Sequence, residues 1–332
     1  MEKTSGTLKL NFGVTIFILF VATIFIAFVS ILIGSTTISF SDFREILISQ
    51  NAEKYLINIF YEIRLPRILL AIVVGGGLSV AGAAFQALLM NPLAEPFILG
   101  ISSGGTFGAM IAVLFGLSFF FVQLFSFAAS LFIVLLVFLI SRRFGVISPN
   151  SMILSGVMIG AFFSSMILVL VNYLDSSFRS AVFWLLGSLS MADKYSIYSV
   201  LIIVLLFSLF LILFAHKMNL LSLGDEQAFH LGVNVKKNRA YIYIIASIIV
   251  GSIVSVSGII GFVGLIVPHA TRLIFGSDNR KVLPFSFFIG AIFVLISDII
   301  ARTIFSPTEI PIGAVTAFVG SPVFIYLLKT RN

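Results

Sequence analysis

The chain has 332 residues, of which 60% are hydrophobic and 10% are charged, with a formal net charge of +7. A soluble domain carries roughly 25% charged residues, so this composition excludes a soluble enzyme and indicates an integral membrane protein. The chain has no Cys, and its three His residues show no ligand-like spacing, so we expect neither a metal nor a cofactor in it.

The apolar segments set the expected architecture. A helix needs about 20 apolar residues to cross the hydrocarbon core, and the charged residues leave room for about ten such segments. We expect an all-α integral membrane protein in which residues 1–332 form a single transmembrane domain. The expected spans are 14–34, 66–90, 98–115, 117–140, 152–172, 197–215, 240–260, 262–275, 284–305 and 311–328, of which the eighth is short.

Two apolar segments need separate comment. The first run, 14–34, is too long for the apolar core of a signal peptide, so we expect it to be retained as a span. Phe178 to Leu189 is too short to cross the membrane and is expected to form a re-entrant or interfacial helix.

An even number of spans places both termini on one side of the membrane. If that side is the cytoplasm, its segments hold 13 of the 20 Lys and Arg residues, against 7 on the other side. Because Lys and Arg are enriched in cytoplasmic segments, we expect a multi-pass protein of the inner or plasma membrane with both termini in the cytoplasm. Membrane topology thus explains the positive charge, and we expect no nucleic-acid partner.

Arg64 and Arg67 flank Pro66 where the second span begins. One turn apart at the outer membrane edge, they form a positive patch that can pair with carboxylates of a partner protein. Snorkelling toward membrane lipid headgroups is the alternative interpretation. The same span ends at Asn91-Pro92, which either lines a constriction at the inner face or forms a plain turn.

Small residues are spaced for close helix packing. Gly100, Gly104 and Gly108 lie four residues apart, and this spacing lets membrane helices approach closely. The second span carries a similar set, namely Gly75, Gly76, Gly77, Ala81 and Gly82. We expect both spans to lie inside the bundle.

The inner loop from Leu221 to Val233 is expected to contain a short helix. Asp225 and Glu226 favour the positive end of a helix dipole, and Gly232 can end the helix. Such a helix can dock in a groove of a partner protein, although a solvated loop is an equally good interpretation. Further along, His269 follows Pro268; we favour a hydrogen-bonded structural His over a titrating switch.

The chain shows no energy source of its own. Ion-coupled transporters usually carry ionisable groups at mid-membrane depth, whereas the expected span centres are almost uncharged. Asp298 and Arg302 are near exceptions and are expected to form a local pair four residues apart. The Gly-rich GxxxxGK[ST] motif that binds nucleotide phosphates is absent. A conduit driven by a separate ATPase fits both observations, as does a passive channel.

Six strings occur in order between Arg64 and Leu328: RLPR, GAAFQALLMNPLAEPFILGISSGG, LSLGDEQAFHLG, GIIGFVGLIVPHATRLIFG, DIIAR and EIPIGAVTAFVGSPVFIYLL. This combination resembles the permease subunits of ATP-binding-cassette (ABC) importers for ferric siderophores, haem and cobalamin, the FecCD type. The resemblance implies ten spans per subunit, a second copy of the chain, two cytoplasmic ATPase subunits that bind Mg-ATP, and an extracytoplasmic substrate-binding protein. It leaves the substrate open among iron complexes, haem, cobalamin and oxyanions.

The resemblance also implies roles for single residues. It places docking of the binding protein on Arg64, Arg67 and Arg302. It places the cytoplasmic gate on Asn91 and Leu93, and a second gate strand on Asn150 and Ser151, where Ser148-Pro-Asn-Ser departs from the family's pattern. It places ATPase coupling on Leu223, Gly224, Asp225, Glu226, Ala228 and Gly232. It makes Gly261, Gly264, Pro268 and His269 a structural motif, and Phe178 to Leu189 similar to the outer gate.

Two other classes of protein are weighed against this one. An ion-coupled secondary transporter would continue uptake without ATP while a proton gradient persists. A non-transporting membrane subunit would not stimulate a partner ATPase in a substrate-dependent way. A membrane enzyme is disfavoured, because no nucleophile–base pair or carboxylate dyad lies at a shared depth.

Overall fold

The computed structural model describes residues 11–34, 36, 38–46, 53–143, 146–172, 186–190 and 192–329. Within these residues the regular structure is helical, apart from the antiparallel two-residue strands β1 (Arg142–Arg143) and β2 (Val146–Ile147). The expected re-entrant helix from Phe178 to Leu189 lies mostly outside the described residues.

The helices begin, in chain order, with α1 (Phe12–Leu32), α2 (Phe40–Arg44), α3 (Lys54–Asn58), the π-helical stretch η2 (Ile59–Arg64), α4 (Leu65–Leu88), the 3₁₀ turn η3 (Pro96–Leu99), α5 (Ile101–Leu114), α6 (Phe119–Ser141) and α7 (Pro149–Val171). They continue with α9 (Lys194–Leu213), α10 (Ala215–Leu221), α11 (Asp225–His230), α12 (Val235–Ser257), α13 (Val263–Phe275), α14 (Asn279–Thr303) and α15 (Ile312–Lys329).

Among the described residues, seven helical segments are long and apolar enough to cross a membrane: α1, the continuous stretch from α3 to α4, α6, α7, α9, α12 and α14. Three shorter apolar helices, α5, α13 and α15, complete the set. Together they follow the order of the expected spans, which confirms the all-α membrane fold. Helices α12 and α14 begin at Val235 and Asn279, ahead of the expected spans, because the side chains of Asn234 and Asp278 cap their first turns.

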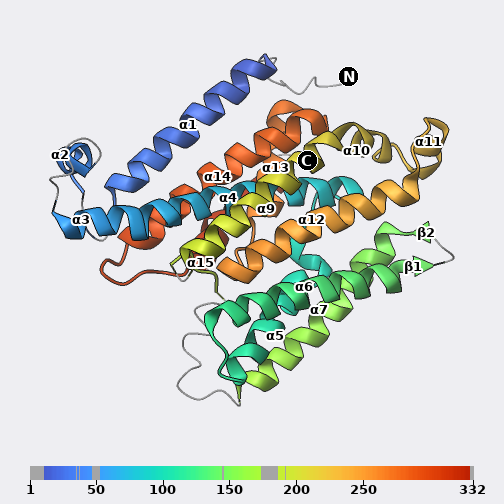
Figure 1. Ribbon diagram of the computed structural model, residues 1–332. Coiled ribbons are helices and arrows are strands. Elements are labelled where there is room, and N and C mark those ends of the chain that lie inside the picture. The colour runs from blue at the N-terminus through green and yellow to red at the C-terminus, as the bar shows by residue number, and fades with distance from the viewer. Residues whose placement is uncertain are drawn as a thin grey trace.

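Helix α4 forms the centre of the bundle. Nearly every side chain from Leu70 to Leu88 is buried, and α9, α12, α13 and α14 pack against it (Figure 1). Helices α5, α6 and α7 form a neighbouring group that joins the centre through contacts of α12 with α5 and α6. The packing of α4 in the centre therefore fixes the positions of the residues at both of its ends.

Glycines permit the close helix contacts around α4. A β-carbon at Gly75 would lie 2.1 Å from the carbonyl oxygen of Gly290 in α14, and one at Gly82 would lie 1.9 Å from that of Gly264 in α13. A β-carbon at Gly108 would lie 2.4 Å from the carbonyl oxygen of Phe125 in α6. These contacts confirm the packing role expected for the small residues of both spans.

Replacing Gly82 with Ala is expected to destabilise the protein. The added methyl group overlaps backbone atoms that cannot rotate away, and overpacking of this kind lowers the free energy of unfolding by about 1–3 kcal/mol. Unfolding in mixed detergent micelles measures the change. Gly160→Ala is the control, since its β-carbon would lie 3.5 Å from the nearest heavy atom; equal effects of the two substitutions would contradict the packing argument.

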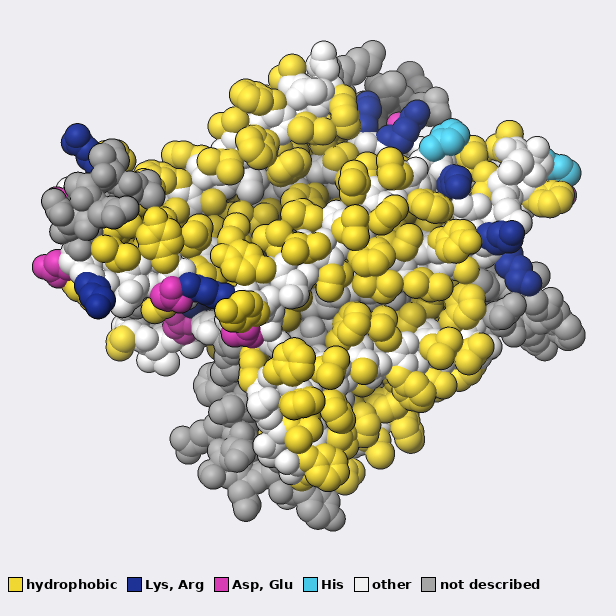
Figure 2. Space-filling model, viewed as in Figure 1, with side chains coloured by type: hydrophobic (Ala, Val, Ile, Leu, Met, Phe, Trp, Pro, Cys, Tyr) yellow, Lys and Arg dark blue, Asp and Glu magenta, His cyan; other side chains and the backbone are white. Residues whose placement is uncertain are grey.

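The surface separates into an apolar belt and two charged ends. Figure 2 shows apolar side chains across the middle of the visible face, with charged side chains gathered toward opposite ends. One end carries α2, α3 and the start of α4, and we call it the Arg67 end; the other carries α10, α11 and the end of α4, and we call it the α11 end (Figure 1). This is the surface that a bilayer requires.

Candidate functional site

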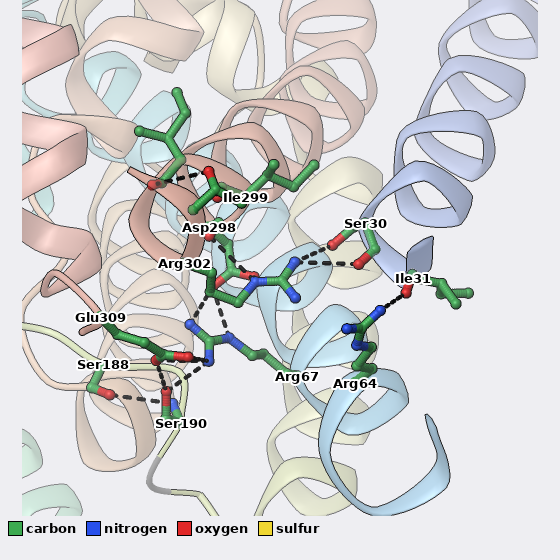
Figure 3. A network of polar contacts seen from close by, with 12 residues as sticks. Ser30, Ile31, Arg64, Arg67, Ser188, Ser190, Asp298, Ile299, Arg302 and Glu309 are labelled. Atoms are coloured by element: carbon green, nitrogen blue, oxygen red, sulfur yellow. Dashed lines mark hydrogen bonds and ion pairs between the residues drawn. The ribbon is translucent and has the colours of Figure 1, made fainter. Parts of the chain in front are cut away.

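A buried ionic network lies at the Arg67 end, where α4 meets α14 (Figure 3). The Nε and Nη2 atoms of Arg67 each lie 2.8 Å from Oδ1 of Asp298, whose side chain is fully buried. The Nη1 atom of Arg67 lies 2.9 Å from both carboxylate oxygens of Glu309 and 2.8 Å from Oγ of Ser190. Arg67 therefore joins α4 to α14 and to the two connecting segments that hold Ser190 and Glu309.

Arg302 completes this network from α14. Its Nε lies 2.9 Å from Oδ2 of Asp298, which confirms the expected pair four residues apart. Its Nη2 donates a hydrogen bond of 2.7 Å to Oγ of Ser30, near the end of α1. Asp298 thus pairs with two arginines and helps to hold α1, α4 and α14 together. We define Arg67, Asp298, Arg302 and Glu309 as the ionic cluster.

Arg64 lies beside Arg302 of the ionic cluster but forms no ion pair within it. Its guanidinium donates to the carbonyl oxygen of Ile31 in the last turn of α1 (Figure 3) and to that of Thr36, which follows this helix. No acidic partner of Arg64 occurs among the described residues, so its charge is not neutralised there. The structure buries all three arginines assigned to docking, with exposed fractions of 3% for Arg64, 7% for Arg67 and 5% for Arg302.

The expected gate residues lie at the α11 end, after α4 stops. The side-chain oxygen of Asn91 accepts the backbone N–H of Leu93 at 2.9 Å, so Asn91 fixes the turn that leaves Leu93 41% exposed. Asn150 and Ser151, expected as a second gate strand, instead belong to the first turn of α7, which follows Pro149. The structure therefore places a helix terminus where a strand was expected.

The inner loop contains the short helix that the sequence predicts. Helix α11 starts at Asp225, and Gly232 follows its end with φ of +80°, a left-handed conformation that suits glycine. Arg239 of α12 binds Asp225 at 2.6 Å, which fixes the helix to the bundle. Leu223, Gly224 and Glu226 lie at the start of this segment, whereas Ala228 is fully buried.

Helix α11 and the residues that flank it present apolar side chains away from the bundle. Leu223, Phe229 and Leu231 are 53%, 70% and 57% exposed. They lie at a charged end of the molecule rather than on the apolar belt (Figures 1 and 2). An exposed apolar face of this kind is typical of a protein–protein contact.

A pocket lies between the gate turn and this loop. It has a volume of about 430 Å³ and is lined by residues of α4, the gate turn, the α10–α11 connection and the turn between α13 and α14, among them Asn91, Asn219, Leu223, Arg272 and Asp278. Sequence reasoning did not group Asn219, Arg272 and Asp278 with the gate, because they come from segments far apart in the chain.

The GFVGLIVPH string forms the start of α13. Gly261 precedes the helix, Gly264 packs against Leu78 of α4, and Pro268 lies inside the helix. His269 is 3% exposed, and its ring centre lies 6.3 Å from that of Phe324 in α15. Within the described residues there is no group of three or more His, Cys, Asp or Glu side chains that could hold a metal ion.

The comparisons with known proteins establish the family. Residues 22–330 match the FecCD transport family. The chain belongs to this family. It is 41% identical over 281 residues to YvrB of Bacillus subtilis, an uncharacterised ABC transporter permease, with 83% of this chain and 80% of that protein covered.

Two further FecCD matches agree with this assignment. The hemin transport system permease protein HmuU of Yersinia pestis is 38% identical over 283 residues, with 83% of this chain and 84% of HmuU covered. A solved structure of an inward-facing ABC transporter, assigned to the metal-chelate type, has a TM-score of 0.85 and 31% identity and covers 96% of this chain and 99% of that one.

These matches confirm the resemblance carried by the six strings. The related FecCD chains are permease subunits of ABC transporters, and ATP hydrolysis belongs to a separate subunit. This chain is a membrane-embedded permease subunit of an ABC transporter of the FecCD family.

Proposed function

We propose that the chain is the transmembrane subunit of a binding-protein-dependent importer that moves an iron complex, haem or cobalamin into the cytoplasm. The observation that carries this proposal is the pair of polar ends that α4 connects. The Arg67 end, where Arg64 keeps a charge that no described acidic residue neutralises, suits an external partner with carboxylates. The α11 end, with its exposed apolar side chains, suits a cytoplasmic partner. The related HmuU is named for haemin, which makes an iron complex or haem the first substrate to test.

The orientation follows from the charge distribution. With the α11 end in the cytoplasm, both termini lie there too, and the excess of Lys and Arg falls on the cytoplasmic side. The α11 segment, Leu223 to Gly232, then contacts an ATPase subunit that binds Mg-ATP. Two copies of the chain and two ATPase subunits complete the transporter.

A second copy of the chain suits the exposed helices. Only 6% of the most apolar part of α7 is buried, and Phe318 and Ile325 of α15 are 83% and 64% exposed. We propose that these helices face the second copy and that the substrate passes between the two copies. The gate turn at Asn91 and Leu93 closes this path at the cytoplasmic face, and the first turn of α7 at Asn150 and Ser151 lies beside it.

Docking of the binding protein is proposed at the Arg67 end. Arg67 and Arg302 are bound to acidic partners, so they position this surface and contribute little net charge to it. Arg64 keeps an uncompensated positive charge under a cover formed by Gly34 and Thr36. A carboxylate on the binding protein reaches Arg64 when that cover moves aside. The structure therefore favours Arg64 as the residue that attracts the binding protein.

Arg64→Gln is expected to weaken binding of the binding protein about tenfold and to reduce the effect of salt on that binding, because an interfacial charge is lost. Titration of the binding protein onto the complex in nanodiscs at two salt concentrations measures both quantities. Arg64→Lys keeps the charge, and Arg44→Gln removes an exposed Arg from α2 at the same end. Unchanged affinity and salt dependence in Arg64→Gln would remove the docking assignment.

The proposed function is tested by the ATPase activity of the assembled complex. The chain, its ATPase and the binding protein are reconstituted in nanodiscs, and ATP hydrolysis is measured with and without ligand on the binding protein. Stimulation by the loaded binding protein supports the importer. A rate of ATP hydrolysis that changes with neither the chain nor the binding protein would indicate a non-transporting membrane subunit.

A further inference from the structure

The two ends of helix α13 contact segments with different proposed roles. One end contacts the gate turn, and the other contacts the segment that leads to the ATPase. The helix packs against α4, α14 and α15. Its 13 residues make it about 20 Å long, so it is too short to cross the roughly 30 Å hydrocarbon core alone. Its polar contacts lie near its first and last turns.

The first turn of α13 is attached to the gate turn. Glu95, four residues after Asn91, accepts the backbone N–H of Phe262 at 2.8 Å. Phe262 precedes α13 with φ of +69°, which is rare for a residue with a side chain. The Glu95 side chain therefore holds an otherwise unfavourable start to the helix.

Packing reinforces this attachment. A β-carbon at Gly264 would lie 2.8 Å from Pro96, the residue after Glu95, and 2.8 Å from the carbonyl oxygen of Leu78. Nε2 of Gln86, in the last turns of α4, donates to the carbonyl oxygen of Leu265 at 3.1 Å. The first turn of α13 and the segment 86–96 thus form one packed unit.

The last turn of α13 is attached to the α10–α11 side through Arg272. Its Nη2 donates to Oδ1 of Asn279 at 2.9 Å and to the carbonyl oxygen of Ala83 at 3.2 Å. Asn279 is 1% exposed, and both its backbone N and its Nδ2 donate to Oδ1 of Asn219 at 2.8 Å. Asn219 belongs to α10, which leads directly into the α11 segment.

Asp278 closes this second set of contacts. It accepts a 2.6 Å hydrogen bond from Nδ2 of Asn219. Burial would raise the pKa of Asp278, but hydrogen bonds from Arg280 and Asn219 outweigh it and lower this pKa to about 2. The carboxylate is therefore ionised at neutral pH, and the contact between α10 and the start of α14 persists.

We propose that α13 is the rigid link through which the α11 segment controls the gate turn, with Glu95 and Arg272 as its positioning residues. A displacement of α10 moves Asn219 and, through Asn279, Arg272. Because α13 is a single short helix, the displacement reaches Phe262 and hence Glu95 and the turn at Asn91 and Leu93. The inference rests on the proposed function, since it assumes an ATPase at α11.

The test uses the complete complex in proteoliposomes and measures the amount of substrate imported per ATP hydrolysed. Glu95→Ala and Arg272→Gln are each expected to lower this ratio about tenfold, which is typical of the coupling between two sites. Asn219→Ala breaks the same link at a half-buried position without removing a charge and should lower the ratio too. Glu95→Gln keeps a hydrogen-bond acceptor and should retain most of the import-to-ATP ratio. Lys281→Gln, at an exposed position beside this set of contacts, is the matched control and should leave the ratio unchanged.

Gate movement gives a second readout. Because the chain has no Cys, Leu93→Cys provides one spin-label site per copy, and the distance between the two labels reports the gate. Nucleotide should change this distance in the otherwise unaltered complex and leave it unchanged when Arg272→Gln is added.

The outcomes separate the link from the proposed function. A normal import-to-ATP ratio in Glu95→Ala, Arg272→Gln and Asn219→Ala would overturn the link, and so would import and hydrolysis that fall in proportion. If Glu95→Ala or Arg272→Gln fails to assemble, Asn219→Ala decides alone. A complex with unaltered sequence that imports nothing on ATP would instead contradict the proposed function.

Discussion

Asp298→Ala is expected to lower the free energy of unfolding by about 3–5 kcal/mol, because it leaves Arg67 and Arg302 buried without their shared anion. The fully buried carboxylate of Asp298 lies within 2.9 Å of both guanidinium groups. Like charges then remain in a site that excludes water. Unfolding in mixed detergent micelles gives the change in free energy directly.

Glu309→Gln is the control for this substitution. Glu309 binds the same Arg67, but its side chain is 37% exposed, so solvent screens the pair and the expected loss is about 1 kcal/mol or less. If Asp298→Ala destabilises the protein no more than Glu309→Gln does, the ionic cluster does not hold α1, α4 and α14 together.

Phe229→Asp is expected to weaken binding of the ATPase subunit at least about thirtyfold, since loss of a central aromatic contact commonly costs about 2 kcal/mol or more. Phe229 is 70% exposed on α11, so the described part of the bundle leaves most of its ring uncovered. Binding of the purified ATPase to the chain in nanodiscs measures the effect.

The matched control is Phe40→Asp. Phe40 is 67% exposed on α2, at the Arg67 end, so the same chemical change is made at nearly the same exposure on the opposite end. Phe229→Leu, which keeps an apolar side chain, should retain much of the affinity. A complex that is weakened by Phe40→Asp and tolerates Phe229→Asp would place the ATPase at the wrong end for this account.

The helices could be predicted from sequence because their signals are local. Long apolar runs mark the spans, and acidic residues with a following glycine mark α11 between Asp225 and Gly232. The shortness of α13 is also visible, since charges confine it on one side and glycines on the other. Arg302 and Asp298 were predictable as a pair because four residues separate them on one helix.

The long-range contacts could not be predicted in this way. Arg67 and Asp298 lie 231 positions apart, and Glu95 and the backbone of Phe262 lie 167 apart. Hydropathy and spacing carry no information on which helices become neighbours. Two arginines at a helix start therefore suggested an exposed patch, whereas the packing of α14 on α4 buries Arg67 in an ionic cluster. The role of Glu95 could not be predicted because its partner is the backbone N–H of a residue 167 positions away.

The central claim is that energy reaches this nearly uncharged bundle through its α11 end. Accumulation of substrate in proteoliposomes that contain the chain, its ATPase and the binding protein tests it most directly, with either ATP or a proton gradient as the sole energy source. The account predicts accumulation against the gradient with ATP alone and none with the proton gradient alone. Accumulation driven by the proton gradient in vesicles that lack the ATPase would contradict it.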